Sequence, residues 1–225
     1  MMSSYCNVKV HHSICLELRI LIDKILHIIL AIESARPNCS LAMKTLCSLH
    51  FTLDKAKTVI KDCSECSKLY LAITSHKILS RCRKIRDAFE FHLAQIQNAV
   101  PMPLVAKISS ILQDLRDTEF LVEFAEDEAR KVVRSLLEKD FSGSDSMKKE
   151  ELEAIQMATS RLEIKSPFSL FVEKATLKRQ IDKVNDINQK EKELLEYLLY
   201  LLIKYGKSIC QFHDGNQSLT QTRMA

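Results

Sequence analysis

The pair Cys63-Ser64-Glu65-Cys66 has a spacing that resembles a metal or redox motif. Two thiolates at this spacing can share a tetrahedral zinc ion, but a closed zinc site needs two more ligands. The nearest candidates, His76 and Cys82, are six positions apart, which matches neither common second ligand pair. A thioredoxin-like centre needs a preceding strand, and none is evident. Because residues three apart share one helix face, packing explains the pair better, and Cys63 and Cys66 are only weak metal candidates.

Catalytic groups are not evident elsewhere in the chain. Its histidines are scattered, and neither a Gly-x-Ser-x-Gly elbow nor a glycine-rich phosphate loop occurs. His27 lies in an apolar segment, where a packing role is expected. The acidic run Glu126-Asp127-Glu128 is interpreted as a solvated stretch of helix. The sequence therefore predicts no catalytic residue, no cofactor and no small-molecule substrate.

Basic side chains form the best-defined candidate binding surface. They could hold phosphate, an acidic peptide or an anionic membrane, although a solvated helix face is the simpler explanation. Nucleic acid is not expected as a partner, because the chain has no Trp and only 6% aromatic residues for base stacking. The candidate anion- or partner-binding residues are Lys55, Lys57, Lys61, Arg81, Arg83, Lys84 and Arg86.

Composition favours an all-α fold. The chain has 225 residues but only 3 Gly and 4 Pro, too few for the many turns of a strand-rich fold. Residues 1–110 carry 15 Lys and Arg against 8 Asp and Glu, a net charge of +7, whereas residues 111–225 carry 18 against 21, a net charge of −3. The basic half could meet acidic partners, but solvated helix faces also explain a charge of this size.

Apolar periodicity predicts the helices and their order. Leu18, Ile22, Ile25, Ile29 and Ile32 make one helical stripe. Further helices are expected over 40–61, over 67–98 with a break near 74–75, from 103 onward, over 121–139, from 166 onward and over 189–205. Gly206 is expected to cap the last helix.

The predicted organisation is a multi-helix bundle in four segments. Residues 1–140 form a four-helix-bundle-like part, and residues 141–147 form a small, polar linker. Residues 148–207 form a helical extension that packs on the bundle, and residues 208–225 form a polar tail without pattern that is expected to be disordered.

Cysteine usage and hydropathy indicate the cellular compartment of the protein. The N-terminus does not have the pattern of a signal peptide, so the eight cysteines are interpreted as reduced thiols. Asp23-Lys24 and Glu196 interrupt the longest apolar runs below the ~20 residues of a membrane span. A cytoplasmic or nuclear protein is expected, with no signal peptide and no transmembrane segment.

The segment Leu53–Ile73, LDKAKTVIKDCSECSKLYLAI, resembles the helical N-terminal domain of plant U-box ubiquitin ligases that carry armadillo repeats. The resemblance extends from Cys15 to Lys207. Its other segments are Ile32–Pro37, Val100-Pro101, Leu112–Arg116, Glu173–Ala175, Lys192-Glu193 and Tyr197–Gly206.

The resemblance implies a noncatalytic interaction or regulatory domain with protein partners, either ligase substrates or regulators. A full-length member would be a ubiquitin transferase of the RING/U-box type, and we expect the U-box and the armadillo repeats to be absent from this chain. A truncated form, a paralogue that lost the rest and an incomplete gene model remain open. The alternative function is a helical adaptor bundle in signalling that binds an anionic membrane or another anionic ligand.

Overall fold

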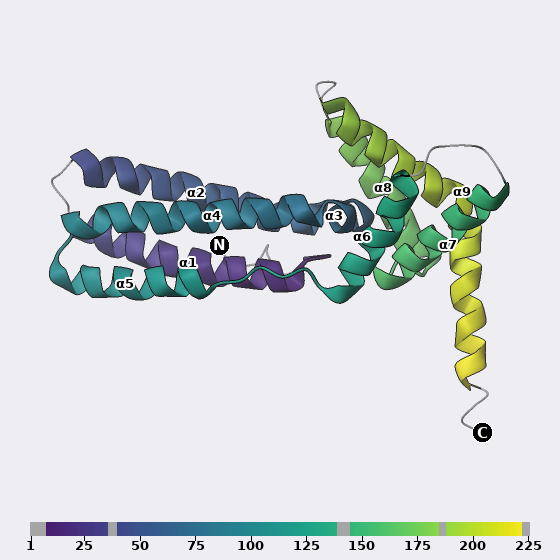
Figure 1. Cartoon of the computed structure of the whole chain (residues 1–225), viewed down its shortest axis with the longest axis horizontal. Helices are drawn as coiled ribbons and strands as arrows, with labels where there is room; N and C mark the ends of the chain where they lie inside the picture. Colours follow the sequence, from purple (N-terminus) through teal and green to yellow (C-terminus); the bar gives the residue numbers. More distant parts are fainter. Residues whose placement is uncertain (1–7, 36–39, 139–144, 185–187, 222–225) are drawn as a thin grey trace. The chain divides into compact units, whose positions relative to one another are not determined.

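The computed structural model describes residues 8–35, 40–138, 145–184 and 188–221 (Figure 1). Those residues form nine α-helices and one short 3-10 helix, with no strand among them. The predicted all-α class is therefore confirmed. Contacts divide the chain into two compact units: Met1–Ser64 with His76–Val122, and Glu65–Ser75 with Glu123–Ala225.

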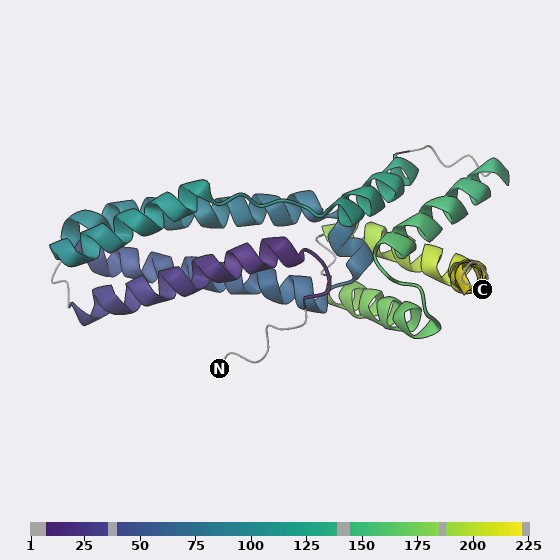
Figure 2. The same cartoon turned by 90° about the horizontal axis from the view of Figure 1, so that it is seen from below.

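The first unit is a bundle of four long helices. Its helices are α1 (His12–Ser34), α2 (Ser40–Glu65), α4 (Ser75–Ile96) and α5 (Met102–Asp117), with a 3-10 turn at Gln97–Ala99 before α5. The four helices lie side by side in both views (Figures 1 and 2). The predicted stripe of α1 is buried, because Leu18, Ile22, Ile25, Ile29 and Ile32 are each at most 7% exposed.

The second unit combines four longer helices with the short α3 (Lys68–Ile73). The others are α6 (Phe124–Leu137), α7 (Asp145–Arg161), α8 (Pro167–Lys183) and α9 (Gln189–Gln221). Leu177, Leu198 and Leu202 are fully buried in its core. The predicted start of α8 is confirmed: the Ser166 hydroxyl accepts a hydrogen bond from the Ser169 N–H, and Pro167 occupies the first turn.

Some predicted boundaries are wrong. The break near residue 74 is present between α3 and α4, but α6 begins at Phe124 instead of 121. Gly206 does not cap α9, which continues to Gln221. Gly206 instead lets α8 approach closely: a Cβ atom there would lie 3.0 Å from Lys174 Nζ and 3.1 Å from Leu170 Cδ2.

The predicted segment boundaries remain predictions. Most of the linker at 141–147 lies outside the described residues. The two contact units divide the chain near residues 64, 75 and 122 and not near 140. The tail predicted over 208–225 overlaps α9 as far as residue 221.

Candidate functional site

Several segments of the resemblance meet in the second unit, where they fix α3. Glu173 of α8 is 4% exposed, and its Oε1 accepts hydrogen bonds from the Ser67 hydroxyl at 2.5 Å and from the Leu69 N–H at 3.0 Å. The side chain of Gln180 accepts the Ser67 N–H at 2.7 Å. These contacts satisfy backbone donors at the start of α3 that the helix itself cannot satisfy. Glu173 therefore has a structural role.

A second cluster joins α7 to α9. Glu151 Oε2 accepts hydrogen bonds from Lys204 Nζ at 2.7 Å and from the Tyr205 hydroxyl at 2.6 Å. Burial by itself would raise the pKa of Glu151, but these two hydrogen bonds outweigh it and lower the pKa. Hydrogen bonds with Glu151, Tyr200 and Tyr205 raise the pKa of Lys204. The Lys204-Tyr205-Gly206 part of the resemblance is thus explained by packing.

The acidic run on α6 differs from its prediction as a solvated stretch. Glu126 is buried, and Glu128 pairs with Arg161 at 2.6 Å. Asp127 pairs with Lys131 and Arg130, whose hydrogen bonds lower its pKa. Only Glu126 is buried, Asp127 pairs with cations of α6 itself, and Glu128 pairs with a cation of α7, against which α6 packs. The run holds the unit together and offers no free pair of carboxylates.

The Cys63-x-x-Cys66 pair is divided between the two units. Cys63 is fully buried in the first unit, where its thiol hydrogen-bonds with Cys15 and lies near Cys82. The hydrogen bond with Cys15, with burial, raises the pKa of Cys63, and burial raises the pKa of Cys82 to about 12. Cys66 is half-buried and belongs to the second unit. High pKa values keep both buried thiols protonated and poorly nucleophilic.

Part of the predicted basic surface comes together in a groove between α2 and α4. We call it the α2–α4 groove, and its volume is about 260 Å³. Arg81 is held by Asp62 at 2.7 Å, and Lys55 Nζ lies 4.2 Å from the centre of the Phe51 ring. The lining residues are Thr52, Lys55, Thr58, Arg81, Lys84, Ile85 and Ala88.

The other predicted cations do not line this groove. Lys57 pairs with Asp54 at 3.5 Å, and Arg86 binds Asp87 and the carbonyl oxygen of Thr118. Arg83 is exposed and lies about 200° around α4 from Arg81. Lys61 is exposed on α2. The structure thus brings together Lys55, Arg81 and Lys84 of the seven predicted residues.

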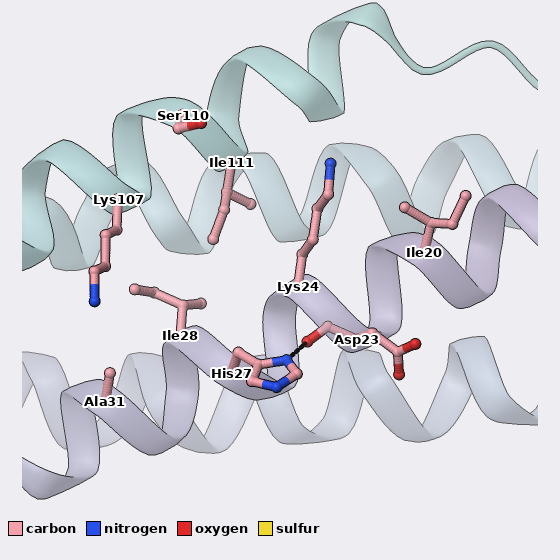
Figure 3. Close-up of a pocket in the computed structure, with 9 residues that line it drawn as sticks. All are labelled: Ile20, Asp23, Lys24, His27, Ile28, Ala31, Lys107, Ser110 and Ile111. Carbon is pink, nitrogen blue, oxygen red and sulfur yellow. Dashed lines mark hydrogen bonds between the residues drawn. The ribbon is translucent and has the colours of Figure 1, made fainter. Parts of the chain in front are cut away.

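A larger groove of about 690 Å³, which sequence reasoning did not predict, lies between α1 and α5 (Figure 3). Its apolar wall comes from Ile20, Ile28 and Ile111. Lys24 lines it and pairs with Asp114 at 2.7 Å. His27 is exposed here instead of packed in the core, and its Nδ1–H donates to the Asp23 carbonyl oxygen at 2.7 Å.

Neither groove contains a recognisable catalytic arrangement. Among the residues that the structure describes, no group of three or more His, Cys, Asp or Glu side chains is placed to hold a metal ion. The α1–α5 groove exposes Ile20, Asp23, His27, Lys107 and Ser110, and the α2–α4 groove exposes Lys55, Thr58 and Lys84. Sequence periodicity identified the buried faces of α1 and α2, but the pairing of α1 with α5 depends on contacts far apart in the chain.

The chain is similar to plant U-box proteins. It is 43% identical over 170 residues to U-box domain-containing protein 5 of Arabidopsis thaliana, a match that covers 76% of this chain and 23% of the relative. It is 38% identical over 221 residues to U-box domain-containing protein 6 of the same plant, covering 96% of this chain and 28% of the relative. The predicted resemblance is confirmed.

Each match covers only part of the relative's length. This chain spans about a quarter of the length of the curated relatives it matches, including U-box domain-containing protein 7, at 35% identity over 202 residues. No protein-family model matches the chain. No solved structure matches it either.

Proposed function

We propose that this chain, a homologue of the U-box domain-containing proteins over most of its own length, is a noncatalytic protein-docking module. It acts in protein ubiquitination through a full-length relative, by binding a ligase substrate or regulator. The similarity to U-box proteins, which covers up to 96% of the chain, carries this proposal.

The contacts of the resembling segments support a docking role. Glu173 and Gly206 lie in two of these segments, and both serve internal packing. Because these shared residues maintain the fold, the solvent-facing grooves are free to bind partners. Both grooves combine apolar side chains with polar and charged ones, and an apolar centre with a polar rim is typical of protein–protein contacts.

The proposed compartment is the cytoplasm or the nucleus. The described cysteines are all free thiols, which fits a reducing environment. No helix in the described part of the chain is long and apolar enough to cross a membrane. The alternative function, an adaptor bundle for an anionic membrane, draws its support from the cations of the α2–α4 groove alone.

A ubiquitin-discharge assay tests the noncatalytic role. The purified chain is incubated with ubiquitin, the activating enzyme and a panel of ubiquitin-conjugating enzymes charged with ubiquitin. We expect no ubiquitination of the chain and no acceleration of thioester discharge, measured on non-reducing gels. Stimulated discharge by any conjugating enzyme of the panel would overturn the noncatalytic role.

A further inference from the structure

The α2–α4 groove has an excess of positive charge that the fold does not neutralise. Three cations line it, and the Asp62 carboxylate pairs with one of them, Arg81. In the residues that the structure describes, Lys55 and Lys84 have no carboxylate partner, and Lys77 lies one turn before Arg81 on the same face of α4. Uncompensated cations around a hollow favour an anionic group inside it.

Exposed aromatic rings extend the groove at one end. Phe51 is 62% exposed and lies under the Lys55 ammonium group. Phe91 is 58% exposed and follows Lys84 by seven positions, two helical turns, so it lies on the same face of α4. Because α2 and α4 run antiparallel (Figure 1) and Asp62 of one pairs with Arg81 of the other, positions 51 and 91 fall at the same end of the groove. The groove therefore offers cations along its length and apolar contact at one end.

We infer that the α2–α4 groove binds an acidic, amphipathic helical segment of a partner protein. Its carboxylates meet Lys55, Arg81 and Lys84, and its apolar side chains pack on Phe51 and Phe91. This inference rests on the proposed docking function and names the chemistry of the partner. A groove between two helices is a recurrent binding site for amphipathic helices, and charge complementarity supplies specificity.

The shape of the site favours a protein segment over a membrane. The cations line a hollow of about 260 Å³ between two helices, where one side chain of a helical partner can enter. A lipid surface is broad and flat, so it offers no single side chain that could enter this hollow. The two occupants therefore differ in whether a side chain fills the groove.

Two charge-reversal variants test whether the cations of the groove are needed for binding. The test variant combines Lys55→Glu with Lys84→Glu, both in the groove. The matched control combines Lys57→Glu with Arg83→Glu, on the same two helices but outside the groove. Both variants change the net charge equally. Circular dichroism and the thermal midpoint establish that each variant is folded.

The binding probe is a fluorescein-labelled synthetic peptide of Glu, Leu and Ala with an amphipathic helical pattern. Fluorescence anisotropy measures its affinity for the wild-type chain and for both variants. We expect the test variant to bind about tenfold or more weakly and the control to stay within about twofold of the wild type. Amide shifts in an NMR titration of the wild-type chain are expected to centre on Lys55, Arg81 and Lys84.

Several outcomes would overturn the inference. They are no binding of the peptide by the wild-type chain, equal weakening in both variants, amide shifts away from the groove, and preferred binding to phosphatidylserine-containing vesicles. The NMR titration decides the matter even if the test variant does not fold. Stimulated ubiquitin discharge would refute the noncatalytic role, whatever the groove binds. Failure of the groove to bind acidic peptides would refute only the inference about the groove.

Discussion

At the scale of single residues, buried carboxylates hold the second unit together by accepting hydrogen bonds from distant segments. Glu173 binds the Ser67 hydroxyl and the Leu69 N–H across more than 100 positions of sequence. Leaving a buried hydrogen-bond donor without a partner costs about 1–3 kcal/mol of stability. Such a carboxylate therefore stabilises the fold by more than the net free energy of the hydrogen bonds it accepts. All three residues belong to segments that define the resemblance to U-box proteins.

We expect Glu173→Gln to lower the free energy of unfolding by about 1–3 kcal/mol, because an amide oxygen replaces a charged acceptor that binds two donors. Urea denaturation monitored by circular dichroism measures the change. Glu196→Gln, at an exposed position of α9, is the matched control and should have little effect. Equal stability of both variants would show that Glu173 does not fix α3.

The lowered pKa of Glu151 predicts that the free energy of unfolding depends on pH. Its pKa in the folded chain lies below the ordinary value of 4.5, so its stabilising contribution is present above that value and is lost as the pH falls through the folded pKa. We expect Glu151→Gln to cost about 2 kcal/mol at pH 7 and to cost progressively less as the pH falls below about 4.5. Urea denaturation across this pH range measures the difference from the wild type.

The exposed Glu153 on the same helix is the control for that pH series. Glu153→Gln should change stability by only a few tenths of a kcal/mol at either end of the pH range. A Glu151→Gln cost that is independent of pH would contradict the lowered pKa.

At the scale of elements, α8 and α9 form an antiparallel pair whose close approach depends on Gly206. Sequence reasoning assigned this glycine to a helix end, because glycine after an apolar run commonly marks a C-terminus. In the structure its missing side chain provides room for Leu170 and Lys174. Spacing along one helix cannot reveal such a contact, since the partner helix supplies the constraint.

Gly206→Leu should destabilise the chain by about 1–3 kcal/mol, because the larger side chain overpacks the contact with Leu170. Gly206→Ala should be close to neutral: its Cβ atom presses on a flexible lysine end and on Leu170, while alanine favours the helix by about 1 kcal/mol. Thermal unfolding compares both with Lys207→Leu at the next, exposed position. An unchanged thermal midpoint for the Gly206→Leu variant would rule out the close approach of α8 and α9.

Local sequence signals predicted much of the helical architecture. The apolar stripe of α1, the Ser166 cap and the break before α4 all follow from residues within a few positions of each other. The candidate site was predicted only in part. Lys55, Arg81 and Lys84 share a groove because α2 and α4 pack side by side, whereas Lys57 and Arg83 face elsewhere on the same helices.

At the scale of the whole molecule, the described residues form two helical units, and internal contacts of the second unit account for residues in three of the segments that resemble U-box proteins: Leu53–Ile73, Glu173–Ala175 and Tyr197–Gly206. The remaining surface of the first unit carries the two grooves and the exposed apolar residues Leu16, Ile20 and Leu30 of α1. The proposed docking role requires this arrangement, in which internal contacts maintain the fold and the grooves are open to solvent.

Displacement of shared partners tests that docking role most directly. U-box domain-containing protein 5 is immobilised, plant extract is applied, and retained proteins are quantified by mass spectrometry with increasing amounts of the soluble chain. We predict that the retained amount of a defined subset of proteins falls in proportion to the amount of chain added. The Glu173→Gln variant, unfolded by heat beforehand, should displace none of them. Retention of every protein at saturating amounts of the folded chain would contradict the docking role.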